Sequence, residues 1–117
     1  DETSYRYDDG RQSSLDPTAI RYAVIPKSGF TQAQLGDFVV VEYRGKRLAA
    51  VVGDLGPVKK FGEGSWRLAT DFGIPNSGNT GGVGSGVTYT FLGGSSLGRA
   101  ASEEKLLGQL ADLQLSI

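Results

Sequence analysis

Two carboxylates in the middle of the chain are the residues whose type and spacing best fit acid–base chemistry. Asp54 stands in Val51–Pro57 (Val-Val-Gly-Asp-Leu-Gly-Pro), and Glu63 stands in Phe61–Ser65 (Phe-Gly-Glu-Gly-Ser). The 117-residue chain contains no histidine and no cysteine, which excludes imidazole bases, thiolate nucleophiles and the usual zinc sites. Any catalysis must therefore use carboxylates, hydroxyls, tyrosine or basic side chains.

Paired carboxylates are the groups that hydrolyse glycosidic bonds, one as proton donor and the other acting on water or on the sugar. We expect Asp54 at the end of a buried strand and Glu63 just before a helix, which can place both across one groove. Sequence spacing does not decide between an inverting pair, about 6.5–9.5 Å apart, and a retaining pair, about 5–5.5 Å apart. A simpler interpretation stays open: Asp54 as a turn former and Glu63 as a complement to the helix dipole.

The elements that must position these carboxylates are mainly strands. Eighteen glycines in a short chain favour a tightly turning β fold. The run 48–53 is apolar on both faces, so we predict it at the centre of the sheet, joined to the preceding strand by a hairpin with Gly45 in the turn. A short edge strand is expected within residues 3–18, and further strands at 20–25, 37–43 and 87–92.

The sequence also predicts two helices. The first begins after Ser65 as N-cap and ends at Gly73, and we expect its Trp66 to lie in the core. The second runs from Ser102, which caps it, to about Ser116. Its predicted apolar stripe consists of Leu106, Leu107, Leu110 and Leu113.

The second helix looks appended, because Gly93–Gly98 has the composition of a linker. We therefore predict a domain over residues 1–98 and a C-terminal amphipathic helix over 99–117.

Composition limits the partners. A net charge of −1 argues against a nucleic-acid partner, and no run approaches the roughly 20 apolar residues that span a membrane. The glycine-rich run 82–86 lacks the Lys-Ser/Thr of a phosphate loop, and there is no calcium-loop spacing, so we expect no cofactor and no metal. The polar start does not resemble a signal peptide; we expect a secreted protein whose signal peptide is not part of this chain. The oligomeric state stays open.

Several short segments within about residues 3–92 form a recognisable set. They are Asp16-Pro17, Ile20–Pro26, Gly36-Asp37, Val51–Pro57, Gly62–Ser65, Leu68-Ala69, Gly73-Ile74, Gly81–Val83 and Gly86–Tyr89. Taken together, they resemble glycoside hydrolase family 75, the chitosanases of fungi and bacteria. The central block is also similar to the signature of double-psi β-barrels in expansins and rare-lipoprotein-A-type peptidoglycan enzymes. The resemblance implies a mainly β fold, a six-stranded double-psi β-barrel with one short helix after the central strand; the C-terminal helix lies outside it.

Carried over to this sequence, the family's essential aspartate is Asp54 and its essential glutamate is Glu63. The resemblance implies inverting endo-hydrolysis of β-1,4 bonds in chitosan, with Glu63 as general acid and Asp54 as general base. From the residues alone these roles stay open, because a helix dipole lowers the pKa of a nearby carboxyl and apolar neighbours would have to outweigh it.

Chitosan is a polycation, so its enzyme should present an acidic groove. The family's acidic N-terminal segment is missing here, and Tyr7–Gly10 is its nearest substitute. The predicted substrate-binding residues are Tyr7, Asp8, Asp9, Asp16 and Asp37.

Two other functions remain as alternatives on the same barrel. One is a peptidoglycan lytic transglycosylase or hydrolase, which needs a single catalytic acid. The other is an expansin-like module that binds polysaccharide through exposed Tyr5, Tyr7 and Tyr43 without cleaving it.

Overall fold

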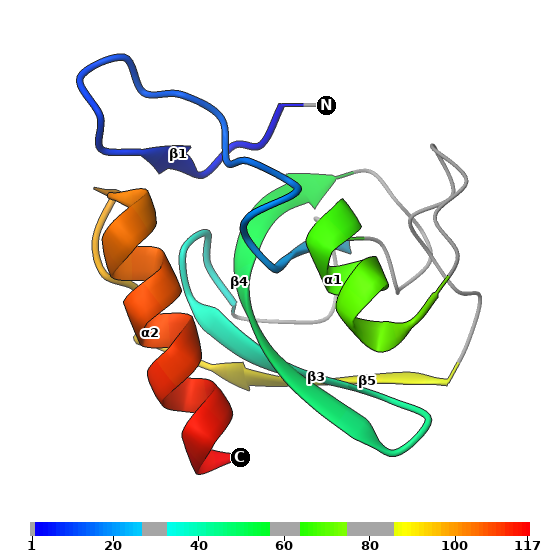
Figure 1. Ribbon diagram of the computed structural model, residues 1–117. Coiled ribbons are helices and arrows are strands. Elements are labelled where there is room, and N and C mark those ends of the chain that lie inside the picture. Colours follow the sequence, from blue (N-terminus) through cyan, green and yellow to red (C-terminus); the bar gives the residue numbers. More distant parts are fainter. Residues whose placement is uncertain (1, 27–32, 57–63, 75–85) are drawn as a thin grey trace.

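The computed structural model describes residues 2–26, 33–56, 64–74 and 86–117. Over these residues the protein is mainly β, as predicted, with strands in two sheets and two helices (Figure 1). In the described ranges the two sheets do not close into a barrel. The elements are β1 (Arg6–Tyr7), β2 (Tyr22–Pro26), β3 (Phe38–Tyr43), β4 (Lys46–Gly56), α1 (Trp66–Phe72), β5 (Val87–Leu92), β6 (Ala100–Ala101) and α2 (Glu103–Ser116).

The larger sheet has the strand order β2-β4-β3-β5, which confirms that the run 48–53 lies inside the sheet. β4 pairs with β2 in parallel and with β3 antiparallel, and β1 pairs with β6 in a separate two-stranded sheet. The hairpin between β3 and β4 turns on Arg44 and Gly45, both with positive φ, at 52° and 80°. Two consecutive residues of that kind are typical of the tight turn that matches the twist of paired strands.

β4 separates two hydrophobic clusters. On one face Ala49 and Val51 pack with Tyr5 and with Leu106 of α2. On the other face Val52 and its neighbours at alternate positions pack with the underside of α1. The two helices thus cover opposite faces of the central strand.

The first helix has the predicted caps. The Ser65 side chain accepts a hydrogen bond from the Leu68 amide, and Gly73 closes the helix in the left-handed conformation. The prediction that Trp66 lies in the core is wrong: its side chain is 48% exposed. Trp66 is the first helical residue, and Leu68 and Ala69 supply the buried side.

The strand predicted at 20–25 begins two residues later. Ile20 is still in a turn, since its amide donates to the Asp16 carbonyl (3.0 Å). The strand ends at Pro26, which is its last paired residue, opposite Gly56.

The second helix is also confirmed, but it is not an appendage. Leu106 and Leu110 are buried in the same cluster as Tyr5, whereas Leu107 is 42% exposed, so the apolar stripe is narrower than predicted. The segment before the helix is not a free linker, because the Tyr5 hydroxyl donates to the Gly98 carbonyl (2.9 Å). Among the described residues, neither helix is long and apolar enough to cross a membrane.

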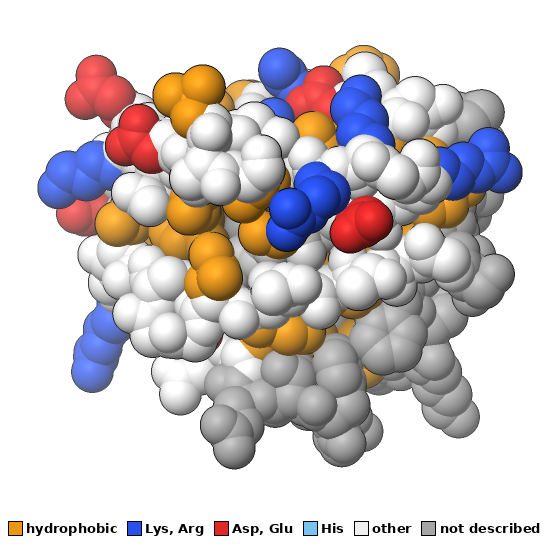
Figure 2. Space-filling view, turned by 90° about the horizontal axis from the view of Figure 1, so that it is seen from below, with side chains coloured by type: hydrophobic (Ala, Val, Ile, Leu, Met, Phe, Trp, Pro, Cys, Tyr) orange, Lys and Arg blue, Asp and Glu red, His pale blue; other side chains and the backbone are white. Residues whose placement is uncertain are grey.

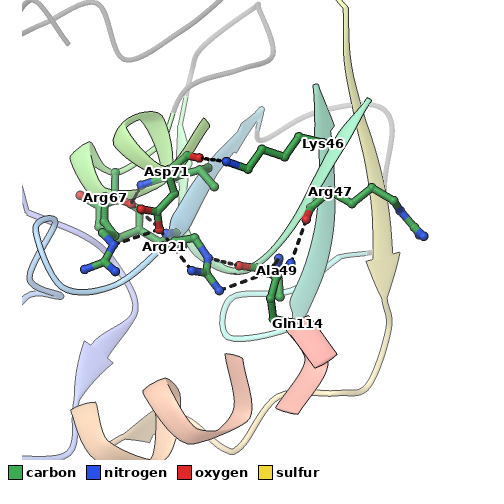
Figure 3. Close-up of polar contacts among 10 residues, drawn as sticks. Arg21, Lys46, Arg47, Ala49, Arg67, Asp71 and Gln114 are labelled. Atoms are coloured by element: carbon green, nitrogen blue, oxygen red, sulfur yellow. Dashed lines mark hydrogen bonds and ion pairs between the residues drawn. The ribbon is translucent and has the colours of Figure 1, made fainter. Parts of the chain in front are cut away.

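A polar cluster holds α2 on the edge of β4 (Figure 3). β2 pairs with β4 only from Val51 onward. Before that point, the side-chain amide of Gln114 forms hydrogen bonds with the β4 backbone of the kind that a neighbouring strand would form. Its Oε1 accepts from the Ala49 amide (2.8 Å), and its Nε2 donates to the Arg47 carbonyl (2.9 Å). Arg21 extends the cluster to α1 through an ion pair with Asp71 (3.2 Å). The C-terminal helix therefore contributes to the sheet that carries the candidate site.

Candidate functional site

The central strand contains a β-bulge immediately before Asp54. Two consecutive residues of β2 pair with Val52 and Asp54, which leaves Gly53 as an extra residue on β4. Val52 packs in the cluster beneath α1, and Leu55 packs against that same cluster although the two are three positions apart. Since side chains alternate along a regular strand, the extra residue has reversed the alternation. The bulge thereby turns Asp54 away from the core beneath α1.

Glycine at position 53 is required by close packing. A Cβ atom there would lie 2.9 Å from the Cβ and Cγ atoms of Tyr22. The Gly53 carbonyl also accepts a hydrogen bond from the Tyr5 amide (3.0 Å), which brings the N-terminal segment alongside the bulge.

We predict that Gly53→Ala lowers the free energy of unfolding by about 1–3 kcal/mol, because the added methyl group overpacks the site against Tyr22. The matched control is Gly108→Ala in α2, where a Cβ meets nothing within 4 Å. That change should raise stability by about 0.5–1 kcal/mol through helix propensity. Urea denaturation of both variants measures the difference, and equal stabilities would contradict the packing described for the bulge.

Asp54 is half-buried and is held by two donors on one oxygen. Its Oδ1 accepts from the Ser4 hydroxyl (2.7 Å) and from the Leu55 amide (3.0 Å). Burial raises the pKa of the nearby Tyr22 phenol, and the charges of Asp54 and Asp16 raise it further. The charges of two carboxylates, one on β4 and one in the N-terminal loop, therefore raise the pKa of the same buried phenol.

A pocket of about 380 Å³ opens beside Asp54, within the size range of sites for small ligands. Ser4 and Leu55, the two residues that donate to the Asp54 carboxylate, both line it. Arg99 is the one charged side chain among its described lining residues. The lining consists of Ser4, Tyr5, Ala33, Gln34, Leu35, Leu55 and Arg99.

Three of the predicted substrate-binding aspartates are exposed in the N-terminal loop. Asp8 is exposed. Hydrogen bonds from Ser13 lower the pKa of Asp9, and hydrogen bonds from the Thr18 hydroxyl and amide (2.7 and 2.9 Å) lower the pKa of Asp16. Asp9 and Asp16 therefore already serve as turn formers. The turn hydrogen bonds fall on Oδ1 of each carboxylate, which leaves Oδ2 for a ligand.

The other two predicted substrate-binding residues are buried. Tyr7 is 8% exposed; its hydroxyl donates to Glu103 (2.7 Å) and accepts from the Asp16 amide (2.9 Å). Asp37 is 3% exposed and accepts from the Gln34 amide (3.0 Å). Both side chains are occupied by contacts within the fold, so the structure does not support their predicted contact with substrate.

An acidic groove is not visible on the face shown in Figure 2, where basic and acidic side chains are scattered and mixed. Among the described residues no three histidine, cysteine, aspartate or glutamate side chains come together as metal ligands.

Glu63 lies outside the described residues, but its neighbour Gly64 is placed. Gly64 forms a bridge with Ala23 of β2, on the side away from β4. Gly64 and Asp54 are therefore two strand spacings apart, about 10 Å between backbones. The Ser65 amide fixes this position by donating to the Tyr22 carbonyl (2.9 Å).

Sequence reasoning missed Ser4 and Arg99. Neither stands in a recognisable motif, and each reaches the pocket from a segment far from Asp54 in the chain. No protein-family model matches this chain, and no curated protein matches it in sequence.

Proposed function

We propose that the protein is a glycoside hydrolase that cleaves β-1,4 bonds of chitosan, with Asp54 as general base. The observation that carries the proposal is the bulge at Gly53, which turns the Asp54 carboxylate away from the core beneath α1. There it accepts hydrogen bonds from Ser4 and Leu55, two residues that line a pocket. Bulges are frequent beside active sites for this reason. Two donors on Oδ1 hold the carboxylate in one orientation, which a general base needs in order to reach the proton it removes.

The proposed reaction is a single displacement. Glu63 gives its proton to the leaving glycosidic oxygen, and Asp54 removes a proton from the water that attacks the anomeric carbon. The bond to the leaving oxygen breaks as the bond to water forms, so the new reducing end has inverted configuration.

The double-psi β-barrel and secretion belong to the same proposal. The parallel pairing of β2 with β4, and the short helix that follows β4, support that architecture. A polysaccharide substrate is consistent with action outside the cell.

Arg99 favours a second candidate, an enzyme that cleaves peptidoglycan. A guanidinium group in the pocket attracts carboxylates and repels the ammonium groups of chitosan. Peptidoglycan carries free carboxylates on its stem peptides. The expansin-like alternative is weakened, because Tyr5 and Tyr7 are buried in the core.

The experiment that tests the proposal compares highly deacetylated chitosan with peptidoglycan as substrates of the wild-type protein and of Arg99→Glu. We expect reducing ends from chitosan, released faster by Arg99→Glu because a repulsive charge is removed. Anhydro-muropeptides identified by mass spectrometry, with slower release by Arg99→Glu, would instead establish the peptidoglycan enzyme.

A further inference from the structure

We infer that Ser4 is a positioning residue for Asp54: its hydroxyl holds Oδ1 and thereby leaves Oδ2 as the oxygen that takes the proton from water. The inference rests on the proposed function of Asp54 as general base. It is carried by the 2.7 Å hydrogen bond from Ser4 to Asp54, which joins segments fifty residues apart.

The fold anchors both neighbours of Ser4. On one side, the Thr3 amide donates to Ser14 Oγ (2.8 Å), and Thr3 Oγ1 accepts from the Leu15 amide (3.0 Å). On the other side, Tyr5 is buried, and its amide donates to the Gly53 carbonyl at the bulge. Ser4 is therefore held beside Asp54 by the backbone on either side, not by its own side chain.

The Ser4 side chain itself has no part in the core. The residue is exposed, and within the described ranges its hydroxyl has one recorded partner, Asp54. Removal of the Ser4 hydroxyl should therefore leave the folded structure unchanged and alter only the orientation of the Asp54 carboxylate.

The two donors fix the orientation of the carboxylate. Oδ1 receives both the Ser4 hydroxyl and the Leu55 amide, whereas no donor on Oδ2 is recorded from the described residues. With the hydroxyl removed, the single remaining bond allows the carboxylate to rotate. A general base acts only within hydrogen-bond reach of the proton it takes, so the chemical step should slow while polymer binding stays the same.

The test compares Ser4→Ala, Ser4→Thr and, as an exposed serine far from the pocket, Ser116→Ala. Steady-state kinetics on chitosan are combined with the ¹³C NMR signal of the Asp54 carboxyl carbon at fixed pH. We expect Ser4→Ala to lower kcat about 10-fold with unchanged KM and to move the carboxyl signal. Ser4→Thr, which keeps the hydroxyl, should restore both, and Ser116→Ala should change neither.

Each of the other outcomes would contradict a different part of the inference. An active protein whose kcat is unaffected by Ser4→Ala, or a change confined to KM, would overturn the positioning role. An unmoved carboxyl signal would overturn the hydrogen bond itself. A moved signal in a protein that cleaves no polymer would keep the hydrogen bond, and would overturn the catalytic role together with the proposed hydrolase function.

Discussion

Asp54→Asn should lower kcat on the cleaved polymer by about 10²–10⁴-fold, the usual contribution of a general base. Asparagine has the same shape, and its Oδ1 can still accept from Ser4 and Leu55, so the bulge and the pocket should persist. The amide cannot take a proton from water, and the negative charge of the carboxylate is lost with it. The dissociation constant for the polymer should stay within twofold of the wild-type value, which corresponds to about 0.4 kcal/mol of binding free energy.

The matched control is Asp112→Asn on the exposed surface of α2, which removes the same charge far from the pocket. Reducing-end release, a binding isotherm and the melting temperature are measured for both variants. If Asp54→Asn kept its activity, Asp54 would be a turn former and the proposed mechanism would be wrong. If both variants lost activity, net charge would be the cause.

The second large effect is expected at Ser65. Its hydroxyl is buried and accepts from two backbone amides, Leu68 within α1 (3.2 Å) and Tyr22 in β2 (3.0 Å). Ser65→Ala removes a helix cap, at a cost of about 1 kcal/mol, and also leaves a buried amide unsatisfied, at about 1–3 kcal/mol. We predict a total loss of about 2–4 kcal/mol.

Ser102→Ala provides the comparison for that prediction. Ser102 caps α2, and among the described residues its hydroxyl accepts from the Lys105 amide alone, at an exposed position, so its loss should cost only about 1 kcal/mol. Denaturant midpoints of both variants, with the slope of the transition checked for constancy, measure the two costs. Equal losses would show that the contact between Ser65 and β2 contributes nothing beyond the cap.

Local features of the fold could be predicted from the sequence. The turn at Gly45 and the caps at Ser65, Gly73 and Ser102 depend on residues within a few positions of each other, and all four are confirmed. Their geometry is set by backbone conformation and by short-range hydrogen bonds, and both depend on the types of a few neighbouring residues.

Features that depend on distant segments could not be predicted. Gly53 is one of several glycines near Asp54, and only the pairing of β4 with β2 across the sheet shows that a bulge lies there. Tyr7 alternates with charged residues, as a surface aromatic does, yet its hydroxyl is paired with Glu103 from α2. Ser4 shows no local sign of its contact with Asp54, because that contact forms only when the N-terminal segment lies along β4.

The most direct test of the central claim, a carboxylate presented by the bulge at Gly53 as the base of an inverting hydrolase, is real-time ¹H NMR of chitosan cleavage by the wild-type protein. The account predicts that the α-anomer of the new reducing end appears first and that the β-anomer follows only by mutarotation. First appearance of the β-anomer would contradict the single displacement. Absence of any new reducing end, from a folded protein, would contradict the hydrolase itself.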